Sequence, residues 1–360
     1  MIKYLKNEEK IVLSLRSLYT KYGYMPYKMN KFEEYDLYAK NKDFLVSDGI
    51  ITFTDTNGKL LALKPDVTLS IIKNAADAKG VKNKMYYSEN VYRISGSTRE
   101  YKEIMQTGLE CIGDIDLYDT YEVITLAKKS LSEISSDYVL EISHMGVISA
   151  LLSSIGGSDN FCKEVLECIG KKSTHEIKTI SQKYGVCECD AMRLCDFVSI
   201  YGEPKDVISK LEKMDVSDEF SACVSELKEI AKLLEDEEGY DKIRLDFSIV
   251  NDMRYYNSIV INGYINGVCE CVLYGGRYDK LLSKMGKSSC GIGFAIYTDL
   301  LASLNEKPSE YDVDTLLVYS ESTNAKKLKE TVKCLVSEGK TVTTQKSIPS
   351  KLRYKEIIEI

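Results

Sequence analysis

The chain of 360 residues has no tryptophan, five prolines and two histidines, His144 and His175. A zinc site would therefore depend mainly on the eleven cysteines. Zinc sites favour two cysteines separated by two residues, with further ligands nearby. The only close pairs here are Cys187-Glu188-Cys189 and Cys269-Glu270-Cys271, which have a shorter spacing. We therefore expect no metal site, and we predict no other cofactor.

Long apolar runs and clustered positive charge are also missing. Residues 1–6 lack the apolar core of a secretory signal, and no stretch approaches the length of a membrane span. A net charge of −7 argues against a broad nucleic-acid surface, because phosphate neutralisation needs clustered lysine and arginine. The cysteines are scattered through apolar patterns, which is typical of free thiols in a reducing compartment. We expect a cytoplasmic protein without a membrane or tRNA partner.

The stretch from 250 to 296 carries the densest set of turn and strand signals. Asn266-Gly267 separates two apolar runs and predicts a hairpin. Gly275-Gly276 predicts a tight turn from the second strand into a helix that ends at Gly286. Two glycines flank Ile292 in the following strand, so a ligand could approach its backbone closely.

A second group of signals lies between 50 and 78. Asn57-Gly58 predicts a hairpin between strands over 50–56 and 60–63. The sequence Lys64-Pro65-Asp66-Val67-Thr68 then precedes a predicted helix over 69–78. Asp66 and Thr68 can cap that helix, and they can also lie at the edge of a binding site.

The most specific site signal follows the predicted strand 85–94 and a polar loop. Because side chains alternate along a strand, Gln106, Gly108 and Glu110 share one face. An amide, an empty position and a carboxylate make poor core material, since a buried charge needs a partner. This face suits a small polar ligand. The alternative is a strand that simply faces solvent.

The remaining patterns organise the chain. A helix is predicted over 8–22, an extended segment follows it, and 32–35 is expected to open another helix. Apolar spacings of three and four predict a helical insertion over about 146–237. After a linker at 306–310, a strand, helix and strand are predicted, so we divide the chain into 1–305 and 306–360.

The order of these motifs resembles the class II aminoacyl-tRNA synthetase core, specifically the histidyl-tRNA synthetases. The matching residues are Tyr255-Tyr256, the Gly-Gly-Arg-Tyr-Asp sequence at 275–279, the 63–68 segment, Arg93 at a strand end, and the Gln106–Glu110 pattern. The resemblance implies an α+β fold, in which an antiparallel sheet is flanked by helices and carries a helical insertion, with a short C-terminal α/β segment. It also implies self-association through the N-terminal helix and strand.

The same resemblance implies a histidine site. The ligand's ammonium group would lie near Asp66, Thr68 and Gln106, and its carboxylate would lie toward Arg93. The imidazole would lie toward Glu110. Tyr256 and Tyr278 would close the site.

Several departures from the synthetase pattern concern catalysis. Asn251 stands at the position of the family's catalytic arginine, Ser95 replaces an acidic residue, and 296–300 lacks the ATP-contacting arginine. Such arginines stabilise phosphate charge during adenylate formation. A retained histidine site without them resembles the regulatory subunits of ATP phosphoribosyltransferase. These are noncatalytic proteins that assemble with a short-form catalytic subunit in the first step of histidine biosynthesis and relay feedback by histidine. The alternatives are a divergent histidine-activating ligase and a stand-alone histidine-sensing module.

Overall fold

The computed structural model describes residues 5–41, 45, 49–94, 99–250, 255–301, 304 and 310–360. Two compact units divide the chain, Met1–Leu304 and Asn305–Ile360. Among the described helices, none combines the length and the apolar character that crossing a membrane requires.

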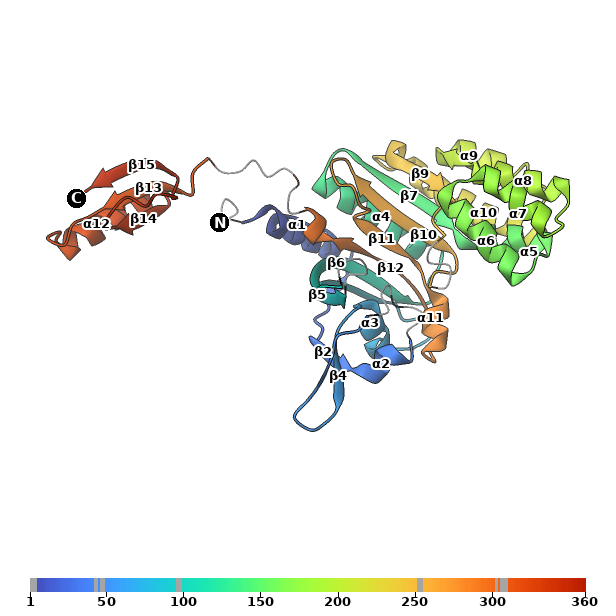
Figure 1. The fold of residues 1–360 in the computed structure, drawn as a ribbon, viewed down its shortest axis with the longest axis horizontal. Helices are drawn as coiled ribbons and strands as arrows, with labels where there is room; N and C mark the ends of the chain where they lie inside the picture. The colour runs from blue at the N-terminus through green and yellow to red at the C-terminus, as the bar shows by residue number, and fades with distance from the viewer. Residues whose placement is uncertain are drawn as a thin grey trace. The chain divides into compact units, whose positions relative to one another are not determined.

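A mixed nine-stranded sheet forms the centre of the first unit (Figure 1). Neighbouring strands from β5 to β7 run antiparallel, as predicted, whereas the pairs β1–β5 and β7–β9 are parallel. The predicted fold class is therefore confirmed, with parallel pairs toward both edges. In spatial order the strands are β1 (Met25–Pro26), β5 (Asn83–Ile94), β6 (Tyr101–Gly113), β12 (Cys290–Tyr297), β11 (Leu273–Arg277), β10 (Ile259–Ile265), β7 (Tyr138–His144), β9 (Ile243–Asp246) and β8 (Tyr201–Gly202).

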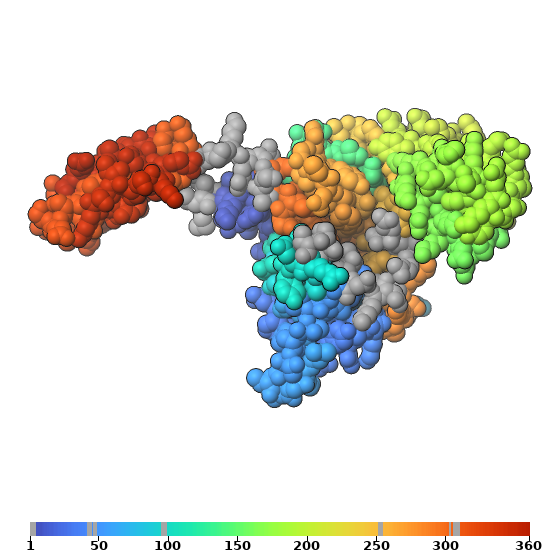
Figure 2. Space-filling model, viewed as in Figure 1, coloured from blue at the N-terminus to red at the C-terminus, as the bar shows by residue number. Residues whose placement is uncertain are grey.

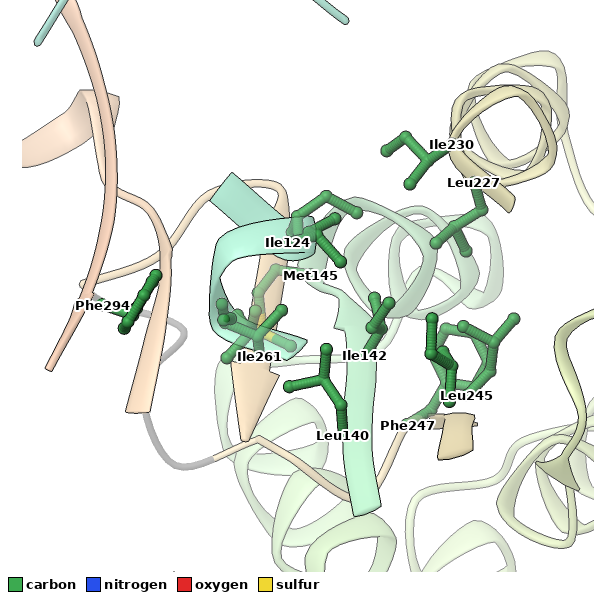
Figure 3. Packing of buried hydrophobic residues seen from close by; sticks show 14 of the residues in the cluster. Ile124, Leu140, Ile142, Met145, Leu227, Ile230, Leu245, Phe247, Ile261 and Phe294 are labelled. Carbon is green, nitrogen blue, oxygen red and sulfur yellow. The ribbon is translucent and has the colours of Figure 1, made fainter. Parts of the chain in front are cut away.

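Helices α1 (Asn7–Lys21) and α4 (Leu117–Ile134) pack together and against this sheet. Helix α4 begins with a reciprocal cap, in which the Asp119 backbone N–H donates to Asp116 Oδ1 and the Asp116 N–H donates to Asp119 Oδ2. Its apolar side is buried in the main core. Figure 3 shows Ile124 of α4 gathered with Ile142 of β7 and Ile261 of β10. This packing fixes the face of the sheet opposite the cavity described below.

The predicted helical insertion follows β7. Its helices are α5 (Met145–Ile155), α6 (Asp159–Lys171), α7 (Thr174–Lys183), α8 (Glu188–Val198), α9 (Pro204–Leu211) and α10 (Asp218–Glu235), and they form the green to yellow-green lobe in Figure 2. The sequence pattern did not predict α7, because that helix buries only Ile177 and Ser181. The 3-10 helix η3 (Tyr240–Lys242) then leads into β9.

A small three-stranded sheet stands beside the large one. It consists of β2 (Phe32–Glu34), β4 (Leu60–Leu63) and β3 (Thr52–Thr54), with helices α2 (Tyr35–Ala39) and α3 (Thr68–Asn74). The hairpin predicted at Asn57-Gly58 is confirmed, with Gly58 at a φ of 81°. The helix predicted to open at 32 is wrong for Phe32–Glu34, which pair with β4. Helix α3 ends at Asn74 rather than 78, because Ala75 is extended.

The turn predicted at Gly275-Gly276 is also wrong. Both glycines lie inside β11, between β10 and β12. The neighbouring strands approach so closely that a Cβ on Gly276 would lie 2.5 Å from the Ile259 carbonyl oxygen. Here the glycines permit close strand packing, and the chain turns one residue later into α11 (Asp279–Lys284). The predicted hairpin at Asn266-Gly267 does join β10 to β11, but β11 begins at Leu273 rather than 268.

The second unit contains a three-stranded parallel sheet and one helix. The strands lie in the order β14 (Val342–Gln345), β13 (Val313–Val318) and β15 (Tyr354–Glu359), with helix α12 (Ala325–Ser337) between β13 and β14 in the chain. The sequence patterns predicted the first strand, the helix and the second strand, but not β15. The predicted linker at 306–310 lies almost wholly outside the described residues.

Candidate functional site

A cavity of about 660 Å³ opens over β6, β11 and β12. All seven residues proposed from the sequence line it, although they come from five separate segments. They are Asp66, Thr68, Arg93, Gln106, Glu110, Tyr256 and Tyr278. Residues 251–254 and 95–98, which include Asn251 and Ser95, lie outside the described part of the chain.

Glu110 lies at the inner end of this cavity and is 2% exposed. Thr68 Oγ1 donates a hydrogen bond of 2.7 Å to Oε1, and the Tyr278 hydroxyl donates a very short one to Oε2. Burial raises the pKa of Glu110 to about 8, although these two hydrogen bonds oppose the shift. At neutral pH Glu110 therefore tends to remain protonated. A cationic ligand would relieve the cost of ionising it.

The glycines beside the site make room for protein side chains as well as for a ligand. Gly293 pairs with Glu110 across β12 and β6, and a Cβ there would overlap Glu110 Oε2. A Cβ on Gly291 would lie 2.5 Å from the ring of Tyr278. Close approach of a ligand to the backbone at these glycines stays a prediction. In the structure they admit the carboxylate and the ring that line the cavity.

Gly108 has a similar role on β6. A Cβ at this position would lie 2.8 Å from the hydroxyl of Tyr87, which pairs with Gly108 in the sheet and also lines the cavity. Tyr87 was not predicted as a site residue. The one indication of it is its position on β5, directly opposite Gly108 in the polar face of β6.

Asp66 and Thr68 lie where the small sheet leads into α3. The Leu69 backbone N–H donates to Asp66 Oδ1 at 2.9 Å, so the predicted capping role is confirmed for Asp66. It is wrong for Thr68, which is the first residue of α3 and donates its hydroxyl to Glu110 instead. Asp66 also lines the cavity, and its pKa is raised because burial disfavours the charge. Asp66 is therefore both a helix cap and a cavity residue, and it places a second acidic group near Glu110.

Arg93 supplies positive charge to the cavity wall. Its Nε donates to the Pro65 carbonyl oxygen at 3.0 Å, and its Nη1 donates to the Tyr297 hydroxyl at 3.1 Å. The guanidinium also lies 5.8 Å from the centre of the Tyr297 ring. These contacts hold Arg93 in a fixed orientation, 9% exposed, before any ligand arrives.

Tyrosine rings form the remaining inner wall. The centres of the Tyr255 and Tyr256 rings are 4.7 Å apart, and those of Tyr255 and Tyr278 are 5.9 Å apart. Such rings attract cations through their negative faces. Together with Glu110, they form a site that suits a protonated ring or an ammonium group.

The cavity is also lined by residues that were not proposed as site residues. They include Lys102, Glu270, Cys271, Tyr274, Tyr297 and Asp299. Among the described residues that line the cavity, four acidic side chains (Asp66, Glu110, Glu270 and Asp299) stand against two basic ones (Arg93 and Lys102). The pKa of Asp299 is raised, first by burial and also by its proximity to Glu270.

His144, Glu226 and Ser258 superficially resemble a catalytic triad. However, Glu226 Oε2 and Ser258 Oγ both face the same His144 nitrogen, Nε2, at 3.2 and 3.3 Å. The other nitrogen, Nδ1, accepts a hydrogen bond from the Val147 backbone N–H at the start of α5. A triad uses the two nitrogens for different partners. His144 is therefore a helix cap that links β7, α10 and β10.

The comparisons with known proteins agree with this fold. A family model described as histidyl-tRNA synthetase matches residues 3–301. The chain belongs to the histidyl-tRNA synthetase family. This confirms the family resemblance predicted from the sequence.

Within the histidyl-tRNA synthetase family, a curated relative from Oceanobacillus iheyensis named ATP phosphoribosyltransferase regulatory subunit is 25% identical over 315 residues. That alignment covers 86% of this chain and 77% of the relative. A solved structure described as an ATP phosphoribosyltransferase regulatory subunit/histidyl-tRNA synthetase from Bacillus halodurans superposes with a TM-score of 0.82 at 22% identity, covering 98% of this chain and 93% of that one. The predicted resemblance to such regulatory subunits is thereby confirmed.

A second solved structure is an ATP phosphoribosyl transferase (HisG:HisZ) complex from Thermotoga maritima. It matches with a TM-score of 0.65 at 21% identity, covering 81% of this chain and 97% of that one. At these identities the two solved structures establish the fold.

Proposed function

We propose that this chain is the noncatalytic regulatory subunit of an ATP phosphoribosyltransferase, that it assembles with a short-form catalytic subunit, and that histidine bound in the cavity transmits feedback inhibition. The named relatives support the regulatory role, and the neighbouring HisG:HisZ complex supports assembly with a catalytic subunit. The observation that carries the proposal is that one cavity is lined by two acidic groups, Asp66 and Glu110, and by the fixed guanidinium of Arg93, which suit the opposed charges of histidine.

Histidine offers one anionic group and two groups that can carry positive charge. We place its ammonium between Asp66 and Gln106, its carboxylate toward the fixed guanidinium of Arg93, and its imidazole toward Glu110. Thr68 connects the two acidic positions, since its hydroxyl donates to Glu110 while its helix is capped by Asp66. A site built from such polar groups discriminates sharply, because a ligand that lacks one partner leaves a buried group unpaired.

The segment that ends β12 and follows it argues against adenylate formation. Residues 296–300 lack the ATP-contacting arginine that the family resemblance places there, and η4 (Thr298–Leu301) begins in this segment. Replacing one stabilising donor usually costs about 10²–10³ in rate.

Feedback requires that histidine bind the active and inhibited assemblies with different affinities, because equal affinity would shift neither state. Tyr256 and Glu110 connect the ligand position to the sheet, and Tyr278 connects it to α11. We propose that these contacts transmit the effect of histidine binding to the rest of the chain. We expect the assembly to work in the cytoplasm without tRNA.

Reconstitution tests the proposal. The chain is co-expressed with a tagged short-form catalytic subunit from a histidine biosynthesis operon, and the purified material is assayed for phosphoribosyl transfer to ATP. We expect a stable complex whose activity exceeds that of the catalytic subunit alone. Failure to co-purify, combined with unchanged activity on mixing, would reject the proposal and favour the histidine-sensing module.

A further inference from the structure

The sequence contains the tripeptide Cys-Glu-Cys twice, at 187–189 and at 269–271. Both copies have the same spacing and the same central residue. The structure nevertheless places their sulfur atoms in different surroundings. Because both copies have the same spacing, a difference in their chemistry must come from their surroundings in the structure.

At the first copy, the sulfurs converge on the surface. Cys187 and Cys189 are both exposed, and their Sγ atoms lie 2.6 Å apart. Asp190 Oδ2 lies 3.0 Å from Cys187 Sγ. One ligand atom from each of the three residues lies within 4.8 Å of the others, the only such group of three found among the described residues.

At the second copy, the sulfurs do not form such a group. Cys271 is buried, and its thiol lies 3.4 Å from the Gly263 carbonyl oxygen and 3.1 Å from that of Leu273. Cys269 is exposed. The thiol of Cys271 is thus hydrogen-bonded to backbone carbonyls. Among the described residues, no group of three possible metal ligands was found at this second copy.

We propose that Cys187, Cys189 and Asp190 form a surface site for a thiophilic divalent metal ion of the zinc class. Two thiolates and one carboxylate are a ligand set that zinc accepts, with water as the fourth ligand of a tetrahedron. Sulfurs that each lie about 2.3 Å from a tetrahedral ion are separated by about 3.8 Å. The two sulfurs, now 2.6 Å apart, would therefore have to separate by about 1.2 Å, and both belong to exposed side chains.

Asp190 is already oriented for this role. Its Oδ1 accepts a hydrogen bond of 2.9 Å from Arg193 Nη1, one turn later on α8, while Oδ2 faces the sulfur. Such an outer contact fixes the direction of a metal-binding carboxylate. Binding replaces the two thiol protons with two metal–sulfur bonds and releases both protons to solvent. Affinity therefore rises with pH until both thiols are ionised.

The site is independent of the proposed regulatory function, because it lies on the insertion and shares no residue with the cavity. The sequence analysis rejected metal binding on spacing and on the shortage of histidine. The geometry changes that conclusion for one of the two cysteine pairs.

The test is a titration of the reduced, full-length chain with Cd²⁺, followed by the ultraviolet thiolate-to-cadmium charge-transfer band, with Zn²⁺ added afterwards as competitor. We expect saturation at one ion per chain and loss of the band when Zn²⁺ displaces cadmium. Cys187→Ser and Cys189→Ser should each reduce the band by about half and weaken binding at least tenfold, and Asp190→Asn should weaken it about 10- to 100-fold. Cys269→Ser is the matched control and should change neither quantity.

Three results would overturn the proposal. One is the absence of a saturable band in the reduced protein. Another is a band that survives both Cys187→Ser and Cys189→Ser unchanged. The third is the loss of two titratable thiols to a Cys187–Cys189 disulfide under conditions that retain the reductant. Circular dichroism of each variant confirms that the insertion is folded, which these exposed positions should allow.

Discussion

Glu110→Gln isolates the charge at the inner end of the cavity. The amide keeps the shape of the side chain, and its oxygen can still accept a hydrogen bond from Thr68 or Tyr278. It cannot become an anion opposite the imidazole. A hydrogen bond to a charged group contributes about 1.5–3 kcal/mol, so histidine should bind about 10- to 150-fold more weakly. Gln106→Ala removes a neutral contact and should weaken binding only about 2- to 13-fold.

Glu110→Gln should weaken histidine binding, but it should increase the stability of the folded chain as the pH rises. The pKa of Glu110 is about 8 in the folded chain and about 4.3 when unfolded, so the folded state holds a proton that the unfolded state loses. This contribution to stability is complete below pH 4.3 and is lost as the pH rises toward 8, by about 1.4 kcal/mol per pH unit. Gln has no such loss. Relative to the original chain, Glu110→Gln should therefore become more stable between pH 5 and 8.

Isothermal titration calorimetry with histidine and urea denaturation across this pH range measure both effects on the same preparations. The reasoning fails if Glu110→Gln binds histidine as tightly as the original chain. It also fails if the variant loses stability with rising pH in parallel with the original. Correct behaviour in denaturation with unchanged binding would show that Glu110 is buried as described but does not contact the ligand.

Four further predictions follow from named contacts. Gly293→Ala places a methyl group on Glu110 Oε2 and should abolish histidine binding in calorimetry while the far-ultraviolet circular dichroism is retained; normal affinity would contradict the close approach of β12 to β6. Lys64→Met removes the partner of Glu89 at 2.5 Å and should cost on the order of 3 kcal/mol in urea denaturation, because Lys64 is 1% exposed; a cost below about 1 kcal/mol would reduce this pair to a surface interaction. Histidine-dependent ATP–pyrophosphate exchange should be undetectable, and Asn251→Arg alone should not restore it; exchange at a synthetase-like rate would instead identify a ligase. The chain should self-associate through its N-terminal helix and strand region, and a strictly monomeric mass in light scattering at micromolar concentration would reject this.

The residues that share a local pattern were the easiest to predict. Gln106 and Glu110 lie on one strand face by the two-residue period alone, and Asp66 lies at a helix start by its capping chemistry. The sequence could not show that these segments meet over one cavity, because strand order depends on long-range pairing. The family resemblance supplied that part.

The errors have a common physical cause. Gly275-Gly276 reads locally as a turn, but the pair lies in a strand because β10 and β12 approach the backbone from both sides. Tyr87 and Asp299 were missed as cavity residues because neither carries a local motif. The two Cys-Glu-Cys copies show the same limit, since identical tripeptides differ only through the elements that contain them.

The most direct test of the central account is the activity of the reconstituted transferase with increasing histidine. Two assemblies are compared, one containing the original chain and one containing Glu110→Gln, each with the same catalytic subunit. The account predicts equal activity without histidine, inhibition of the original assembly, and a half-inhibiting concentration about 10- to 150-fold higher for Glu110→Gln. Identical inhibition curves for the two assemblies would contradict it, because histidine would then act at a site other than this cavity.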